Sequence, residues 1–167
     1  MTAADPSGIL SPAAQELMRR GAEGSAFTQW IGTRLRHFEA GRVEIEIDLR
    51  PNLTQHHGQA HGAVIGYLAD TVSAWAAASV AGDVVTAEYK LNFLAPARGE
   101  TLWARGEVLR AGKRQVVVRA DVYATLDGED TLVAAALATI APVGKAPEPA
   151  QADGASSPEA STPQESP

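Results

Sequence analysis

The segment of residues 61–80 constrains the fold of this chain more than any other. It reads HGAVIGYLADTVSAWAAASV, and Asp70 is its one acidic residue. A run of about 20 apolar residues is long enough to cross a bilayer as a helix. However, Asp70, Ser73 and two glycines interrupt the run, and the chain has no second segment of this kind. We therefore predict a helix that a sheet buries, with small residues that let strands approach closely: Ala63, Gly66, Ala69, Ala76 and Ala77.

Strand patterns lie on both sides of this segment. Residues 42–50 alternate without a fault between apolar and polar side chains, which is typical of a half-buried antiparallel strand. Residues 84–94 alternate as well. We expect four more strands, of which the first is the weakest: residues 30–39, 102–109, 115–126 and 131–140. This order predicts an α+β fold in which one antiparallel sheet wraps around one long buried helix.

The two ends of the chain differ from its middle. A serine–proline pair at residues 11–12 and Gly21 predict a short helix within an N-terminal arm, residues 1–24. Residues 143–167 hold five of the ten prolines and no aromatic residue, so they cannot bury enough apolar surface to offset their chain entropy. We expect one folded domain over residues 25–142, followed by a disordered tail.

Composition argues against several classes of function. The chain has no cysteine, which excludes disulfides and thiolate metal sites and fits a cytoplasmic protein. The net charge is −6 and no basic stripe exists, so we expect no nucleic-acid partner. The N-terminus has no basic start followed by an apolar run, so we expect neither a secretory signal nor a membrane partner.

Two positions on the long helix could carry chemistry. The first amides of a helix lack partners within it and carry partial positive charge, and Gly62 has no side chain that would keep a substrate oxygen from its N–H. Gly62 is therefore a candidate oxyanion donor, although backbone geometry alone could also require a glycine there. Asp70 is a lone acid in an apolar helix, where a carboxylate is costly unless it is paired or used. The structural alternative is a buried carboxylate that caps a backbone group or is hydrogen-bonded to Thr71 or Ser73.

The spacing of these two residues is informative. Asp70 follows Gly62 by eight residues, which is about 12 Å along one helix. One substrate carbonyl cannot touch both groups of the same chain. If both act together, Asp70 must come from a second subunit, and a two-fold dimer would then have two equivalent sites.

The histidines before the helix raise the question of a metal site. His56, His57 and His61 lie close together in the sequence, but the HExxH pattern is missing and Gly58 disfavours a helix there. We expect no metal and no other cofactor, and we expect His61 to stabilise the start of the helix. A serine-hydrolase GxSxG motif is also missing from the sequence.

The run over residues 52–78, with HGA at 61–63 and LADT at 68–71, resembles hotdog-fold thioesterases of the phenylacetic-acid-pathway (PaaI-like) group. TAEYKLNFLAPARGE at 86–100 and LVAAALATIAP at 132–142 resemble the strands that follow in that group. The resemblance covers about residues 25–142, and it implies the hotdog fold.

The resemblance also implies roles for individual residues. The Gly62 amide would polarise a thioester carbonyl, and Asp70, contributed by the second subunit, would act as nucleophile or general base. Gln55 occupies the position of a side-chain amide that would orient water or the thioester. The sequence departs from the group at Ala63, which replaces the second glycine of an HGG motif, and at Ala74, where some relatives carry a hydroxyl.

The expected function is therefore hydrolysis of an acyl-CoA thioester with an aryl or medium-chain acyl group, in a homodimer or homotetramer. A thiolate with a pKa near 8.5 leaves without a strong general acid, so one carboxylate and one oxyanion donor suffice. The residues expected at the substrate are His61, Ala63, Tyr67, Phe93 and Arg98.

Two alternatives stay open at this point. A non-catalytic acyl-CoA-binding dimer would use the same pocket. A hotdog dehydratase or hydratase would pair an acid with a catalytic histidine, and the fact that no histidine follows Asp70 counts against it.

Overall fold

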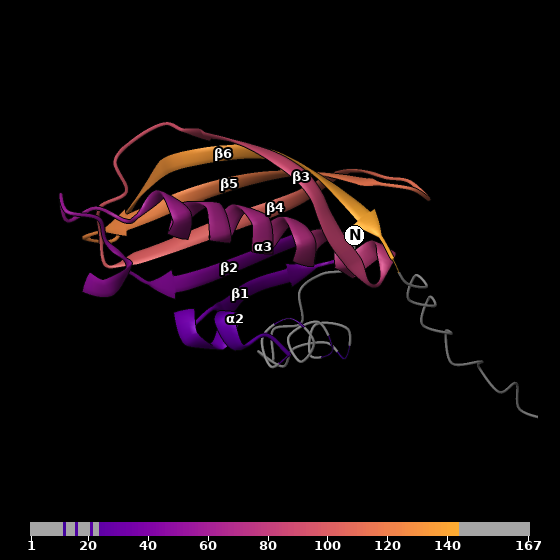
Figure 1. Ribbon diagram of the computed structural model, residues 1–167, viewed down its shortest axis with the longest axis horizontal. Coiled ribbons are helices and arrows are strands. Elements are labelled where there is room, and N and C mark those ends of the chain that lie inside the picture. The colour runs from indigo at the N-terminus through magenta and orange to yellow at the C-terminus, as the bar shows by residue number, and fades with distance from the viewer. Residues whose placement is uncertain (1–11, 13–15, 17–20, 22–23, 144–167) are drawn as a thin grey trace, which may run out of the picture.

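The computed structural model describes residues 24–143, together with positions 12, 16 and 21. Its elements follow in the order α2 (Ala26–Ile31), β1 (Arg34–Glu39), β2 (Arg42–Asp48), η2 (Pro51–Leu53), α3 (Gly62–Ala81), β3 (Val84–Phe93), β4 (Thr101–Ala111), β5 (Val116–Leu126) and β6 (Glu129–Pro142) (Figure 1). The helix expected in the N-terminal arm falls almost wholly outside the described residues, as does the tail. The expected domain limits stay predictions.

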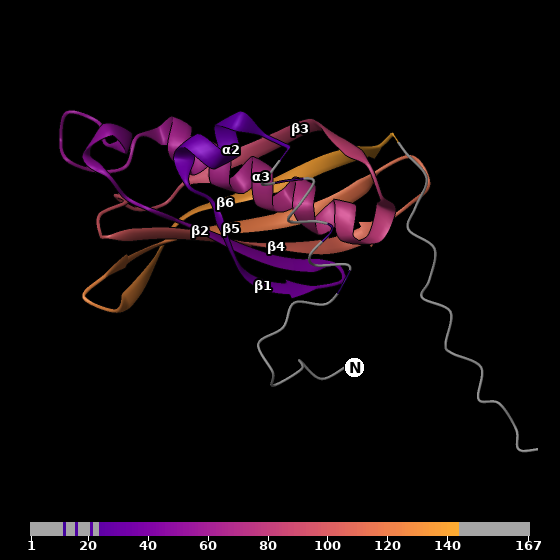
Figure 2. The same cartoon turned by 90° about the horizontal axis from the view of Figure 1, so that it is seen from below.

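The six strands form one antiparallel sheet in the order β1-β2-β4-β5-β6-β3. The helix α3 runs along one face of this sheet and contacts five of its strands (Figures 1 and 2). This is the predicted α+β architecture, a sheet wrapped around one buried helix, and it is the hotdog fold.

Alternation in the strands decides which side chains meet the helix. In β2, Val43, Ile45 and Ile47 are fully buried, while the acidic residues between them lie on the opposite face. The helix comes very close to β4, because a Cβ atom built on Gly106 would lie 2.6 Å from the Val72 carbonyl oxygen. Glycine at this position therefore sets the distance between helix and sheet.

The face of α3 toward the sheet is apolar or small throughout, and it buries Leu68 and Val72 completely. α3 is long and apolar enough to span a membrane, yet 56% of its apolar stretch is buried inside the protein. The prediction of a core helix is confirmed. Of the small residues expected at the contact, Gly66, Ala69, Ala76 and Ala77 are buried, but Ala63 is exposed and the expectation for it was wrong.

The prediction of a strand over residues 30–39 was wrong in its first part. Ser25 caps a short helix by accepting a hydrogen bond from the Thr28 amide, and Gly32 ends that helix with a left-handed backbone. Trp30 and Ile31 therefore belong to α2, and the strand begins at Arg34. A six-residue helix is too short to show helical periodicity in its side chains.

Candidate active site

The start of α3 presents a free backbone amide. His61 is the N-cap, and its Nδ1 accepts a hydrogen bond of 3.0 Å from the Ala63 amide. The amides of Val64 and Ile65 donate to the His61 carbonyl. Within the described part of the chain, the Gly62 N–H has no hydrogen-bond acceptor. An amide at the positive end of a 20-residue helix is suited to bind a developing oxyanion. The cap also agrees with the role expected for His61.

Two aromatic residues of β3 flank this end of the helix. A Cβ atom on Gly62 would lie 3.3 Å from Phe93 Cζ, and one on Gly66 would lie 3.2 Å from the Tyr89 hydroxyl. Phe93 and Tyr89 are 60% and 40% exposed, although they face the helix side of the sheet. Phe93, which we expected at the substrate from the sequence, therefore lies beside Gly62.

Asp70 lies two turns further along the same helix. Asp70 as a whole is half-buried, but its Oδ1 atom is buried and has no hydrogen-bond partner among the described residues. The Ser73 hydroxyl donates to the Ala69 carbonyl at 2.7 Å, so it is not the partner that the structural alternative required. A buried carboxylate oxygen without a partner is costly, and such groups cluster at functional sites.

One chain does not bring Gly62 and Asp70 together. Both lie on the continuous helix Gly62–Ala81, so they are about 12 Å apart along its axis. Ala63, Tyr67 and Asp70 lie on the side of α3 that the sheet does not cover, since Ala63 is exposed and the other two are half-buried. A site that uses both groups thus needs a second copy of the chain against this face.

Gln55 sits in a tight loop just before the helix. Its Oε1 accepts a hydrogen bond of 2.9 Å from the His57 amide, and its backbone closes the loop with Gln59 and Gly58. The side-chain oxygen is thus engaged within the loop, and the amide nitrogen is the end left to contact a ligand. The rings of His56 and His57 lie side by side at the exposed tip, tilted by 45° with their centroids 3.9 Å apart. The described residues include no group of three or more side chains that could hold a metal ion.

Arg98 lies in the turn beside this loop. The Ala60 amide donates to the Ala97 carbonyl at 2.9 Å, which ties the turn between β3 and β4 to the start of α3. Arg98 is exposed next to that contact. The structure thus brings Arg98 to the same end of the molecule as Gln55 and Gly62.

Tyr67 belongs to an aromatic cluster that sequence reasoning missed in part. Its hydroxyl shares a hydrogen bond of 2.7 Å with Thr33, and its ring meets Phe27 edge-on at 5.2 Å. The ring centroid of Phe27 in turn lies 5.6 Å from that of Trp30, which is also on α2. The signal that could have revealed α2 was the pair of caps, Ser25 before it and Gly32 after it.

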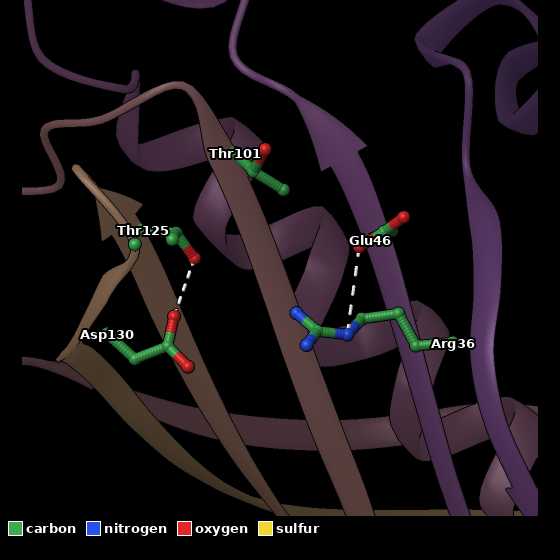
Figure 3. A pocket seen from close by; sticks show the side chains of 6 residues that line it. Arg36, Glu46, Thr101, Thr125 and Asp130 are labelled. Carbon is green, nitrogen blue, oxygen red and sulfur yellow. Dashed lines mark hydrogen bonds and ion pairs between the residues drawn. The ribbon is translucent and has the colours of Figure 1, made fainter.

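A hollow lies on the face of the sheet opposite to α3 (Figure 3). It measures about 480 Å³ and is lined by Arg36, Glu46, Thr101, Thr125, Gly128 and Asp130. Its charges already have partners: Arg36 pairs with Glu46 at 3.7 Å, and Thr125 donates to Asp130 at 2.6 Å. The Thr125 hydroxyl, joined by the Trp103 indole, keeps the pKa of Asp130 below its ordinary value. These contacts stabilise the sheet and present no reactive arrangement.

Comparison with known proteins settles the family. The model of the thioesterase superfamily matches residues 57–131, a range that includes Gly62 and Asp70. A Saccharolobus solfataricus protein named as a candidate esterase is 33% identical over 112 residues, which are 66% of this chain and 73% of that protein. The chain belongs to the thioesterase superfamily.

Solved structures agree with this membership. A thioesterase family protein from Silicibacter pomeroyi is 33% identical, with a TM-score of 0.74 over 77% of this chain and 96% of its own. A Streptococcus mutans protein solved with acetyl-CoA bound is 28% identical, with a TM-score of 0.62 over 68% and 90%. The PaaI protein of the E. coli phenylacetic acid degradation operon shares the fold at 22% identity, with a TM-score of 0.71 over 83% and 99%.

Proposed function

We propose that this member of the thioesterase superfamily hydrolyses acyl-CoA thioesters at sites that two copies of the chain share. One observation carries the proposal: a free amide at Gly62 and a carboxylate oxygen without a partner at Asp70 lie on one helix, eight residues apart. The first is a donor for the oxyanion and the second is a base or nucleophile. Each group lacks its counterpart within its own chain.

The edge strand β3 supports pairing with a second copy. On its outer edge β3 has no strand partner among the described residues, and it runs for ten residues with Val85, Tyr89 and Phe93 exposed. The other edge, β1, is shorter, and Arg34 and Arg36 make it a poor template for pairing. Two β3 strands paired about a two-fold axis would set the α3 helices side by side in opposite directions. Each Asp70 would then lie near the Gly62 of the other chain.

The reaction needs few groups. The thioester carbonyl oxygen accepts a hydrogen bond from the Gly62 N–H, and negative charge develops on that oxygen as the carbonyl carbon is attacked. Asp70 of the second copy either attacks the carbon or takes a proton from an attacking water, and Gln55 orients the water or thioester. The carbon–sulfur bond breaks, the thiolate leaves, and water supplies the oxygen and the proton that complete the acid and the thiol.

Two observations support a CoA thioester as the substrate. The Streptococcus mutans relative was solved with acetyl-CoA bound, so a protein similar to this chain holds a CoA thioester. In this chain, exposed Arg98 lies beside the loop before α3, where a phosphate of the CoA group could pair with it.

The test is release of thiol from a panel of acyl-CoA esters, followed with a thiol reagent. We expect turnover for aryl or medium-chain esters and its near-complete loss in Asp70→Asn. Binding of the esters without release of thiol would instead support the non-catalytic dimer. Addition of water to an enoyl-CoA without loss of CoA would support the hydratase. Either result would overturn the proposal.

A further inference from the structure

The helix α2 exposes two large aromatic rings where a water-facing surface usually carries polar groups. Phe27 is 54% exposed and Trp30 is 56% exposed, and their ring centroids lie 5.6 Å apart. Together with Tyr67, which Phe27 meets edge-on, they form a contiguous apolar surface that we call the α2 aromatic cluster. Clustered exposed aromatic residues mark binding sites, whereas single ones need no explanation.

This cluster is held rigidly. Ser25 and Gly32 fix both ends of α2, and the Thr33–Tyr67 hydrogen bond of 2.7 Å ties the end of α2 to the middle of α3. Arg50 adds hydrogen bonds to the Trp30 and Ile31 carbonyls at 3.0 and 3.2 Å. Rings held in place before binding lose little conformational entropy when a ligand arrives.

The cluster is continuous with the candidate active site. Tyr67 precedes Asp70 by three residues, so both side chains emerge on one side of α3, one turn apart. Ala63 and Ala74 lie on the same side of the helix. Because their side chains are small, little projects from this side between the cluster and β3. Figure 1 places α2 near the β1 side of the sheet, away from the edge strand β3. A second copy that pairs along β3 would therefore leave Phe27 and Trp30, the part of the cluster that lies on α2, uncovered.

We infer that the α2 aromatic cluster binds the acyl group of the substrate, with Phe27 and Trp30 as specificity-determining residues for bulky apolar acyl groups. The inference rests on the proposed function for the position of the reacting carbon near Asp70. An acyl chain that leaves this carbon along α3 meets Tyr67 after one turn and then the edge of Phe27. An acetyl group is too short to reach the two rings of α2.

Binding to a chain that cannot turn over its ligand tests the inference. In an Asp70→Asn background, affinities for acetyl-CoA, octanoyl-CoA and phenylacetyl-CoA are measured by calorimetry, with Phe27→Ala and Trp30→Ala compared against the background. We expect both substitutions to weaken octanoyl-CoA and phenylacetyl-CoA about tenfold or more and to leave acetyl-CoA unchanged. Trp30→Phe should keep most of the affinity. Leu137→Ala is the matched control, because Leu137 is 52% exposed on the other face of the sheet.

Three results would overturn the inference. These are equal losses for all three ligands, no loss for any of them, and a change in oligomeric mass by light scattering, which would assign the cluster to a contact between copies. Failure of the proposed function is seen separately, as a wild-type chain that releases no thiol. The binding series decides the role of the cluster in that case too.

Discussion

Gly62 and Asp70 could be picked out as candidate site residues from their residue types and their places in the sequence. A lone acid in a 20-residue apolar helix stands out because burying a carboxylate costs free energy. The Oδ1 atom of Asp70 indeed lacks a hydrogen-bond partner among the described residues. Gly62 is conspicuous only by its position, because His61 caps the amide after it and leaves its own amide free. Phe27 and Trp30 carried no such signal, since their role depends on contacts with Tyr67, a residue much later in the chain.

The Gly62 amide can be removed without removing a helical hydrogen bond. Gly62 is the first residue of α3, where proline is well tolerated, and the extended backbone of His61 suits a following proline. We expect Gly62→Pro to fold and to lose turnover about 10²–10³-fold, the cost of one oxyanion donor.

Gly62→Ala is the matched control. It adds a Cβ atom against the same exposed Phe93 ring, 3.3 Å from Cζ, but it keeps the N–H. Turnover and thermal unfolding are measured for both variants. Equal turnover in folded Gly62→Pro and Gly62→Ala would remove this amide from the mechanism.

At the scale of elements, periodicity predicted the sheet and the core helix because each is long enough to repeat its pattern. It failed for α2, whose six residues hold less than two turns, and whose caps are its only sequence signal. It also missed the bulge between Thr86 and Glu88, which takes Ala87 out of the alternation expected for residues 84–94. A bulge adds one residue without changing the residue types around it.

The close contact between α3 and β4 predicts that alanine at Gly106 and alanine at Gly66 affect the stability of the fold differently. Gly106→Ala places a Cβ atom 2.6 Å from the Val72 carbonyl oxygen, which is backbone and cannot yield. We expect a loss of about 1–3 kcal/mol in the free energy of unfolding. Gly66→Ala meets only the Tyr89 hydroxyl at 3.2 Å, and alanine favours the helix, so its stability should hold or rise. Chemical denaturation measures both, and similar losses in the two variants would contradict this account of the packing.

Asp130 predicts a pH dependence for the β5–β6 hairpin. Hydrogen bonds from Thr125 and then from Trp103 lower the pKa of this carboxyl in the folded chain. Its contribution to stability is therefore complete above the unfolded pKa of about 3.9 and is lost as pH falls through the lower folded pKa. We expect Asp130→Asn to lower the Tm at neutral pH, and the difference from wild type to shrink as the pH falls below about 3.9. A difference that stays constant with pH would show that the charge is not what the hydrogen bonds stabilise.

At the scale of the whole molecule, we expect the fold to require less of the chain than its full length. Val143 donates to the Asp83 carbonyl at 2.8 Å, just after β6 ends. We expect a chain that ends after Val143 to keep both its Tm and its turnover, since residues 144–167 are poor in apolar side chains. A fall of many degrees in the truncated chain would place the domain boundary further along.

The shared site is the central claim, and mixed dimers test it most directly. We expect Asp70→Asn and Gly62→Pro chains each to be nearly inactive alone. If Gly62 and Asp70 act across the dimer, a heterodimer of the two single mutants has one intact site and one site with both defects. A heterodimer of a doubly mutated chain with a wild-type chain has one defect in each site.

The measurement is thiol release by purified, differently tagged heterodimers of both kinds. The account predicts that the heterodimer of single mutants recovers about half the wild-type turnover, one working site of two, while the heterodimer with the double mutant stays nearly inactive. The reverse pattern, with activity only in the heterodimer that contains a wild-type chain, would place both groups in a site within one chain and contradict the account.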